Sequence, residues 1–243
     1  MEKQEYAKGK NKLLSARDLC KTYGEGSVVT KAVDGVDLDI YEGEMLVIIG
    51  NSGSGKSTLL NLIGGMDTPD AGEIIIGGRD ICRLDDKELT DYRMKEVGFV
   101  FQSFNLISDL KASENVRLTA DTKKDPDIVN KVFETVGMTD KIDRYPSQLS
   151  GGEQQRVAIA RALAGSYSFI LCDEPTGALD YETGKQILSE LEKLVRRDGK
   201  TIVIVTHTRE IGNMADRVIV MKNGRIIQET VNEYPVAVEE IEW

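Results

Sequence analysis

A glycine-rich stretch that could bind phosphate follows an apolar run early in this 243-residue chain. Residues 50–57 read Gly-Asn-Ser-Gly-Ser-Gly-Lys-Ser and fit the pattern G-x-x-x-x-G-K-[ST]. The glycines let successive backbone N–H groups point into one concavity at the positive end of a following helix. Lys56 adds a cation for the terminal phosphates, and the Ser57 hydroxyl is a ligand that suits Mg²⁺. A turn that binds nothing is the alternative, but the strand pattern before the stretch and the helix pattern after it favour a nucleoside triphosphate site.

Two adjacent acids follow a second apolar run, Phe-Ile-Leu-Cys at residues 169–172. A carboxylate at the end of such a strand, here Asp173, can hold Mg²⁺ through water. Its neighbour Glu174 is placed to polarise an attacking water as a general base. A solvated strand end is the alternative interpretation, and it is weakened by Pro175, which ends the strand directly behind the two acids.

Three further side chains stand at the ends of predicted strands. His207, the only histidine, follows the apolar run at residues 201–205 and could donate to a γ-phosphate. Gln102 follows the strand at residues 98–101 and could ligate Mg²⁺ or position water, although an ordinary polar loop residue is also consistent. Tyr23 could stack on adenine or could simply pack on a small sheet.

A second glycine-containing helix start lies at residues 149–153, Leu-Ser-Gly-Gly-Glu. Ser150 followed by Glu153 three residues later is a capping box. That motif does not explain Gly151 and Gly152, which disfavour a helix relative to alanine unless a ligand must approach the backbone closely. One nucleotide does not need two phosphate cradles on one chain, so the repetition suggests that two chains share the nucleotide.

The composition is typical of a globular protein: 40% of the residues are hydrophobic and 30% are charged. A net charge of −10 argues against nucleic acid as the main partner. Three cysteines without C-x-x-C spacing predict reduced thiols and neither disulfides nor a zinc site. We expect no signal peptide and no direct membrane span, since no apolar run approaches the ~20 residues that cross a bilayer. Any membrane role would then require another subunit.

Strand patterns alternate with helix patterns, which predicts an α/β fold with a mainly parallel sheet and a ligand at the carboxyl ends of its strands. Turns are expected at Gly24–Gly26 and Asp34–Gly35, a helix starting at Asp125–Pro126 and closed by Gly137, and a hairpin at Asn223–Gly224. The expected organisation is a single domain over residues 1–230, with an antiparallel β subdomain at 12–43, a core at 44–102 and 166–230, an all-helical insertion at 103–165, and an acidic tail at 231–243.

This set of motifs resembles the nucleotide-binding subunit of ABC (ATP-binding cassette) transporters over nearly all of residues 12–230. The matches are Tyr23 as the aromatic loop, Gly50–Ser57 as Walker A, Gln102 as the Q-loop, Leu149–Glu153 as the signature, Phe169–Asp173 as Walker B, Glu174 as the catalytic base, Ala178–Asp180 as the D-loop and His207 as the switch histidine. Glu153 stands where many members have glutamine. The resemblance implies a P-loop NTPase fold, ATP and Mg²⁺ as ligands, and ATP hydrolysis.

The amino-acid sequences at residues 64–69, 101–106 and 173–180 are similar to those of the macrolide-export and lipoprotein-release branch. That branch implies a homodimer on the cytoplasmic face of the plasma (inner) membrane, attached through permease subunits that export or extract a peptide, antibiotic or lipoprotein. The implied contacts to ATP in one subunit are those of Tyr23, Gly50, Asn51, Ser52, Gly53, Ser54, Gly55, Lys56, Ser57, Thr58 and Gln102. The second subunit would add Ser150, Gly151, Gly152, Glu153 and Asp180, and Ser57, Gln102 and Asp173 (through water) would hold the metal.

The permease's coupling helix is expected near Gln102–Leu110 and the helical insertion. The apolar series Phe101, Phe104, Leu106, Ile107 and Leu110 motivates this, and burial of the series within the subunit is the equal alternative. Other classes remain: a soluble ABC ATPase of a cytosolic assembly system, a cell-division-type regulatory ATPase, or a nucleotide-gated regulator. Glu174 and His207 argue against the last. Trp243, the only tryptophan, could dock or remain free, and the transported substrate is not predicted.

Overall fold

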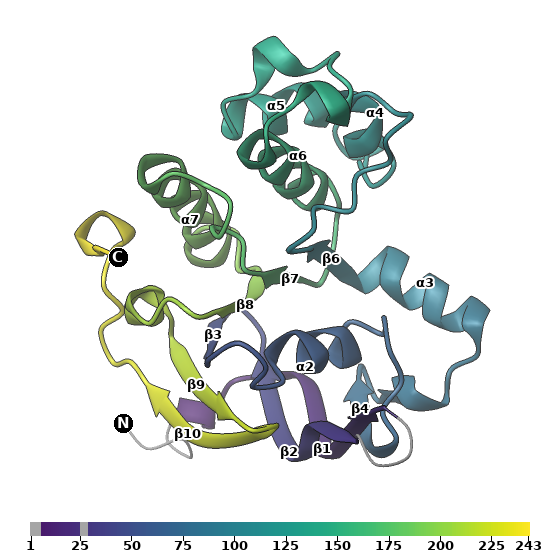
Figure 1. The fold of residues 1–243 in the computed structure, drawn as a ribbon, viewed down its shortest axis with the longest axis vertical. Coiled ribbons are helices and arrows are strands. Elements are labelled where there is room, and N and C mark those ends of the chain that lie inside the picture. Colours follow the sequence, from purple (N-terminus) through teal and green to yellow (C-terminus); the bar gives the residue numbers. More distant parts are fainter. Residues whose placement is uncertain (1–5, 25–28) are drawn as a thin grey trace.

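Two β-sheets of different kinds meet in the computed structural model, which describes residues 6–24 and 29–243 (Figure 1). The larger sheet has the strand order β10–β9–β3–β8–β7–β6. Its strands are β3 (Met45–Ile49), β6 (Val97–Val100), β7 (Phe169–Asp173), β8 (Thr201–Thr206), β9 (Arg217–Lys222) and β10 (Arg225–Val231). The pairs β3–β8, β3–β9, β7–β8 and β6–β7 are all parallel, and only β10 runs antiparallel to its neighbour within this sheet. The predicted mainly parallel sheet is confirmed, as is the hairpin at Asn223–Gly224.

The smaller sheet is antiparallel and has the order β2–β1–β4–β5. Its strands are β1 (Lys12–Tyr23), β2 (Thr30–Tyr41), β4 (Ala71–Ile76) and β5 (Arg79–Asp80). Strand β4 thus pairs with β1 and β5 pairs with β4, whereas the sequence assigned residues 71–80 to the core at 44–102. The expected turn at Asp34–Gly35 is also wrong, because β2 continues through it with a shift of register beside Leu19 and Gly35 at φ +66°. Of the expected turn at Gly24–Gly26, residues 25 and 26 lie outside the described part of the chain.

The helices are α2 (Lys56–Ile63), α3 (Asp86–Glu96), α4 (Ala112–Arg117), α5 (Ile128–Thr135), α6 (Gly151–Leu163) and α7 (Tyr181–Arg196). Short 3₁₀ turns lie at η1 (Ile81–Arg83), η2 (Thr139–Lys141), η3 (Pro146–Gln148), η4 (Glu210–Met214) and η5 (Val238–Glu240). Residues 103–165, all of them described, contain helices and no strand. The helix expected from Asp125–Pro126 begins only at Ile128, with Asp127 preceding it, and ends before Gly137 at φ +63°.

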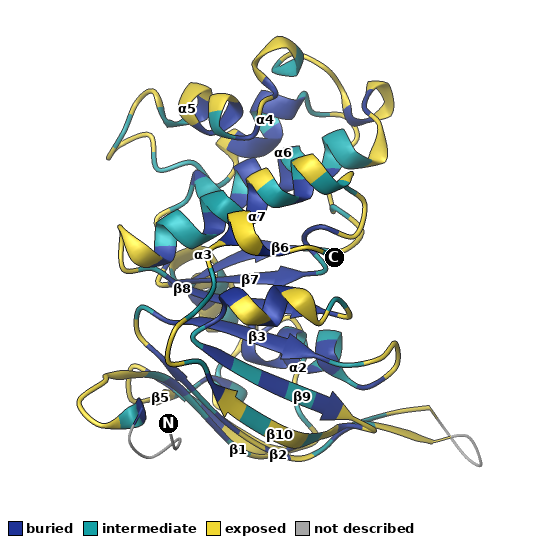
Figure 2. Ribbon diagram, turned by 90° about the vertical axis from the view of Figure 1, so that its left-hand side faces the viewer, coloured by how far each residue is buried: buried dark blue, intermediate teal, exposed yellow. Residues whose placement is uncertain are grey.

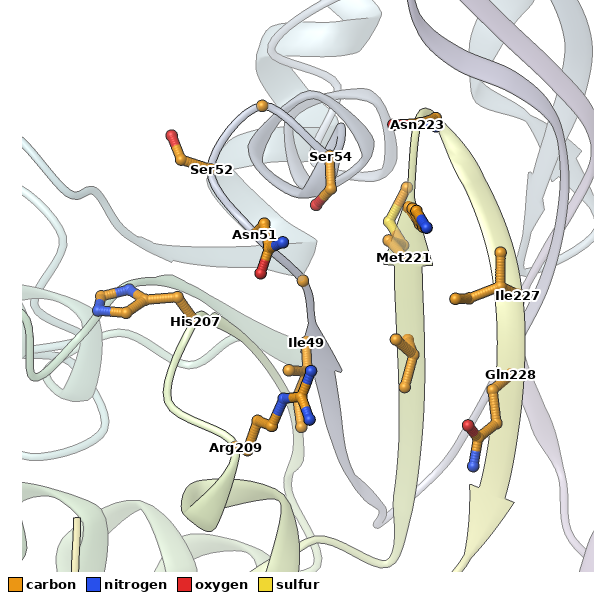
Figure 3. Close-up of a pocket in the computed structure, with 14 residues that line it drawn as sticks. Ile49, Asn51, Ser52, Ser54, His207, Arg209, Met221, Asn223, Ile227 and Gln228 are labelled. Carbon is orange, nitrogen blue, oxygen red and sulfur yellow. The ribbon is translucent and has the colours of Figure 1, made fainter.

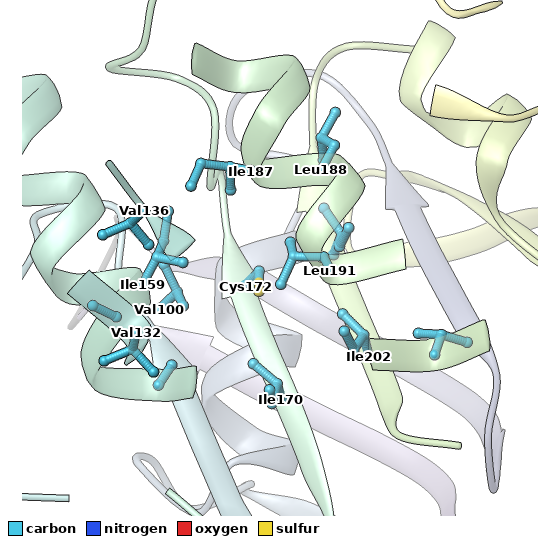
Figure 4. Packing of buried hydrophobic residues seen from close by; sticks show 14 of the residues in the cluster. Val100, Val132, Val136, Ile159, Ile170, Cys172, Ile187, Leu188, Leu191 and Ile202 are labelled. Carbon is cyan, nitrogen blue, oxygen red and sulfur yellow. The ribbon is translucent and has the colours of Figure 1, made fainter. Parts of the chain in front are cut away.

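The parallel strands separate two apolar clusters, because successive side chains of a strand point to opposite faces. Met45, Val47 and Ile49 of β3 belong to one cluster, together with side chains of α7 and of the helices at 112–163. Leu46 and Ile48 belong to the other, between the parallel sheet, α2 and the smaller sheet. Figure 4 shows the first cluster, and Figure 2 shows that the central strands are buried throughout. Burial on both faces explains the continuous apolar runs in the sequence.

The last residues are packed against the rest of the chain. Strand β10 extends through Val231, so the expected tail at 231–243 begins inside a strand. Val238 and Ile241 are fully buried in the cluster that contains α7. Across residues 6–24 and 29–243, no helix is both long enough and apolar enough to cross a membrane.

Candidate functional site

The carboxyl ends of three adjacent strands, β3, β8 and β7, converge on one cavity of about 630 Å³. The segment after β3 supplies the glycine-rich loop, the residue after β7 is Glu174, and the residue after β8 is His207. The residues that line the cavity are Asn51, Ser52, Gly53, Ser54, Gly55, Lys56, Ser57, Thr58, Gln102, Glu174 and His207. Side chains far apart in the sequence are therefore brought together by the parallel order of the strands.

The loop adopts a backbone that requires glycine at two places. Gly53 has φ +75° and Gly55 has φ +99°, both in the left-handed region that L side chains rarely occupy. A Cβ atom on Gly55 would lie 2.0 Å from the carbonyl oxygen of Ala32 on β2. A Cβ atom on Gly50 would lie 2.5 Å from the carbonyl oxygen of Met221 on β9. The loop is thus held between backbone segments of both sheets.

Lys56, which lines the cavity, and Asp173, which contacts Ser57 of the lining, are both buried. The Lys56 ammonium donates to the carbonyl oxygens of Gly50 (2.8 Å) and Asn51 (3.2 Å). Burial lowers the pKa of Lys56, against the opposing effect of Glu174 and Asp173. Burial raises the pKa of Asp173, and Glu174 adds to this, while the Ser57 hydroxyl counteracts it. Both groups would regain a favourable environment beside an opposite charge.

The donor set fits Mg²⁺. The Ser57 hydroxyl donates to Asp173 Oδ1 at 3.0 Å, so two hard oxygen ligands already lie side by side, and Gln102 lines the same cavity. In the described part of the chain no group of three or more His, Cys, Asp or Glu side chains could hold an ion by itself. Mg²⁺ commonly takes one or two carboxylates and completes its shell with water and phosphate oxygens, so a sparse oxygen site suits it.

Glu174 is held by two neighbours from β8 and the residue after it. Thr206, which is 1% exposed, donates its hydroxyl to Glu174 Oε2 at 3.1 Å. His207 Nδ1 lies 2.9 Å from Glu174 Oε1, and the imidazole itself is largely exposed beside the cavity. The backbone of Glu174 has φ +50°, an uncommon conformation for a residue other than glycine. Sequence analysis missed Thr206, although its place as the last residue of β8 was a usable signal.

A second cavity of about 620 Å³ adjoins the first, between the glycine-rich loop and the hairpin of β9 and β10. Figure 3 shows Asn51 and Ser54 of the loop facing Met221 and Asn223 across it. The Gly224 N–H donates to the Ser54 carbonyl at 3.0 Å, so the hairpin turn supports the loop. The sequence predicted the turn, but no local pattern indicated which segment it would contact.

Tyr23 is not among the described residues that line either cavity. Its hydroxyl donates to Asp67 Oδ2 at 2.6 Å, and its side chain is 44% exposed. The Lys21 ammonium donates to the other oxygen of Asp67 at 2.7 Å and to the Thr68 carbonyl. Asp67 therefore fixes the ring of Tyr23, and sequence analysis missed it. Stacking of Tyr23 on a base stays a prediction.

The second glycine-containing segment also lies outside both cavities. Ser150 and Glu153 form the capping box at the start of α6, and Glu153 is paired with Lys141 as well. A Cβ atom on Gly152 would lie 3.1 Å from the carbonyl oxygen of Ala178. Asp180 caps α7 by accepting from the Thr183 N–H at 3.0 Å. Neither segment is brought to the glycine-rich loop within one copy of the chain.

Comparison with known proteins gives one family. A family model described as "ABC transporter" matches residues 33–177. The macrolide export ATP-binding/permease protein MacB of Brucella melitensis is 42% identical over 223 residues, which are 90% of this chain and 34% of that protein. The chain thus spans about a third of the length of the macrolide-export relatives that it matches.

Other relatives match over nearly their whole length. An uncharacterized ABC transporter ATP-binding protein of Thermotoga maritima is 44% identical, over 88% of this chain and 94% of that protein. The ATP-binding protein MJ0796 of Methanocaldococcus jannaschii is 45% identical, over 89% and 96%. A dimeric structure of the MJ0796 cassette with ADP and Pi superimposes with a TM-score of 0.85 at 42% identity, covering 90% of this chain and 98% of that one.

The contacts of the two left-handed glycines yield a prediction about stability. Gly55→Ala should lower the free energy of unfolding by about 2–5 kcal/mol, because it adds the cost of a left-handed alanine to an overlap with Ala32 O. Gly53→Ala is the matched control: it shares the positive φ but has no atom within 4 Å of the added Cβ, so it should cost only about 1–2 kcal/mol. Urea unfolding measures both. Equal losses of unfolding free energy in the two variants would contradict the close contact of Gly55 with Ala32.

Proposed function

Because this chain belongs to the ABC transporter family, we propose that it binds ATP with Mg²⁺ in the cavity at the glycine-rich loop and hydrolyses it. The observation that carries the proposal is the 2.9 Å pair of Glu174 and His207 on the rim of the cavity that Lys56 also lines. Lys56 and His207 then contact one γ-phosphate, and Glu174 acts as general base on the water that attacks it.

The loop N–H groups and Lys56 bind the phosphates. Burial lowers the pKa of Lys56, so an anionic phosphate oxygen, a stronger partner than the carbonyls of Gly50 and Asn51, stabilises its charged form. Ser57, Asp173 (through water) and Gln102 would hold Mg²⁺. When bound, the ion supplies positive charge that neutralises the phosphate oxygens.

Glu174 orients the attacking water and accepts its proton. The bonds from Thr206 and His207 occupy one position on each carboxylate oxygen, which leaves further lone pairs for the water. Water attacks the γ-phosphorus, the bond to the β-phosphate oxygen breaks, and ADP and phosphate result. His207, exposed on the rim, is placed to contact the γ-phosphate while it is present.

A second copy of the chain completes the site in this proposal. Ser150, Gly151, Gly152, Glu153 and Asp180 lie outside the cavity of their own chain. The first four form the amino end of a 13-residue helix, whose dipole favours an anion. The MJ0796 cassette forms a dimer that holds ADP and Pi. We extend that arrangement to this chain, so that ATP joins two copies and its hydrolysis separates them. Both copies bind the charge of the γ-phosphate, and its loss on hydrolysis shifts the equilibrium from the joined to the separated copies.

We propose that a membrane-embedded permease subunit binds the helical insertion at residues 103–165. The protein would then lie on the cytoplasmic face of the membrane. Of the apolar series around Gln102, Leu106 packs against the core and Phe101 stacks on Phe99 at 4.1 Å between ring centroids. Phe104 and Leu110 are partly buried, and Ile107, 47% exposed, is the member of the series most accessible to a coupling helix. Leu118, directly after α4, is also exposed. Relatives with macrolide-export names support an exporting or extracting permease.

Glu174→Gln should retain ATP binding but lower the rate of hydrolysis by at least about 100-fold, because the amide cannot accept the proton. The variant should form a dimer in MgATP that is stable enough to detect by analytical ultracentrifugation. Glu182→Gln, an exposed position near the start of α7, is the matched control and should hydrolyse ATP normally. Hydrolysis by Glu174→Gln at the wild-type rate would refute the assigned role.

Ile107→Glu should reduce the fraction of tagged chain that sediments with native membranes by more than about fivefold, because the charge must be desolvated in an apolar contact. ATP hydrolysis by the isolated chain should not change. Val29→Glu introduces the same charge at an apolar residue that is 54% exposed, directly before β2, and it should sediment like wild type. Undiminished sedimentation of Ile107→Glu would rule out this docking site.

A further inference from the structure

Residues 236–243 form a strap that lies against α7 (Figure 1). Val238 and Ile241 are 0% and 2% exposed and join the same apolar cluster as Ile187 and Leu188 of α7. The strap is therefore anchored by burial of its apolar side chains.

The polar and aromatic contacts of the strap concentrate on the first two turns of α7. The Tyr181 hydroxyl donates to the Ile241 carbonyl at 3.0 Å, and the Lys185 ammonium donates to the Glu239 carbonyl at 2.7 Å. The rings of Tyr181 and Trp243 lie with their centroids 5.0 Å apart, a favourable distance for an aromatic pair.

Gly184 explains why the start of α7 depends on the strap. A glycine inside a helix costs about 1 kcal/mol relative to alanine. Here a Cβ atom would lie 3.3 Å from Trp243 Cζ2, so the missing side chain makes room for the indole. The helix loses intrinsic stability in its first turn, and the contact with Trp243 compensates for this loss.

The chain that leads into the strap is tied to the segment after His207. Asn232 donates from its side-chain amide to the carbonyls of Gly212 (3.0 Å) and Ala215 (2.6 Å), and the Val236 N–H donates to the Asn213 carbonyl at 2.9 Å. These carbonyls belong to η4 and the residue after it. The stretch 232–243 therefore connects the segment that follows His207 to the helix that Asp180 begins.

We propose that the strap positions Asp180, with Tyr181 and Trp243 as positioning residues for ATP hydrolysis. The inference rests on the proposed function, in which Asp180 meets the site of the second copy. Asp180 itself is held by the Thr183 N–H, within the turn that Tyr181 begins. Loosening the strap frees this turn, and the D-loop then meets its partner less often in the productive arrangement.

The test measures ATP hydrolysis and nucleotide affinity separately. Trp243→Ala should lower kcat roughly tenfold, while KM and the affinity of the monomer for ATP, which depend on the glycine-rich loop, stay within about twofold. Trp243→Phe should restore most of the rate, because it keeps an aromatic ring on Tyr181. Tyr181→Phe loses one hydroxyl and keeps the ring, so it should lower kcat by a smaller factor. This variant replaces Trp243→Ala in the test if circular dichroism shows that Trp243→Ala does not fold. Tyr234→Ala, at an 87% exposed position just before the strap, is the control and should hydrolyse ATP like wild type.

A double-mutant cycle separates positioning from a general structural effect. If the strap acts through Asp180, Trp243→Ala should add little to the loss of kcat already caused by Asp180→Ala. Additive losses, or an unchanged kcat in both Trp243→Ala and Tyr181→Phe, would overturn the role of the strap while the wild-type chain still hydrolyses ATP. A wild-type chain that does not hydrolyse ATP would instead overturn the proposed function and the strap inference together.

Discussion

The close passage of Gly55 against β2 is the constraint on which the site depends. Its backbone lies so near Ala32 that a single methyl group would be 2.0 Å from the carbonyl oxygen, and Gly50 is confined in the same way by Met221. Such contacts exclude side chains at these glycines, so that a ligand can approach the loop backbone closely. The smaller sheet and the β9–β10 hairpin thus act as supports for the phosphate loop, which explains why elements without catalytic residues are needed for the site.

The parallel sheet supplies the second requirement, the juxtaposition of the acidic and basic groups. Strands β3, β8 and β7 are neighbours, so Lys56, His207 and Glu174 meet although more than 100 residues separate the first from the others. The burial that makes this arrangement rigid also disfavours the charges of Lys56 and Asp173. A bound phosphate with its metal ion relieves both, so ligand binding and the electrostatics of the site reinforce each other.

Much of the fold and the site follows from local patterns. The apolar runs at β7 and β8, the glycine-rich loop and the Asn223–Gly224 turn carry their own signals, and the expected strand-end residues Gln102, Glu174 and His207 line one cavity. The errors concern pairing at a distance. Residues 71–80 join the smaller sheet, where a Cβ atom on Gly72 would lie 2.5 Å from the carbonyl oxygen of Arg17 on β1, a close approach that no local pattern encodes. The bulge at Gly35, the support of Glu174 by Thr206 and the docking of Trp243 likewise depend on tertiary contacts.

The central claim is that each glycine-rich loop is completed by α6 of a second copy, and mixing two inactive variants tests it. Lys56→Ala disables the loop, and Gly151→Asp places a negative charge at the start of α6, where an added Cβ would have only an ordinary contact of 3.8 Å with Phe104. Each variant alone should be inactive. In a head-to-tail dimer of the two, one site carries both defects and the other carries none, so the mixture should recover ATP hydrolysis. A mixture as inactive as its separate components would show that loop and signature act within one chain and would contradict the account.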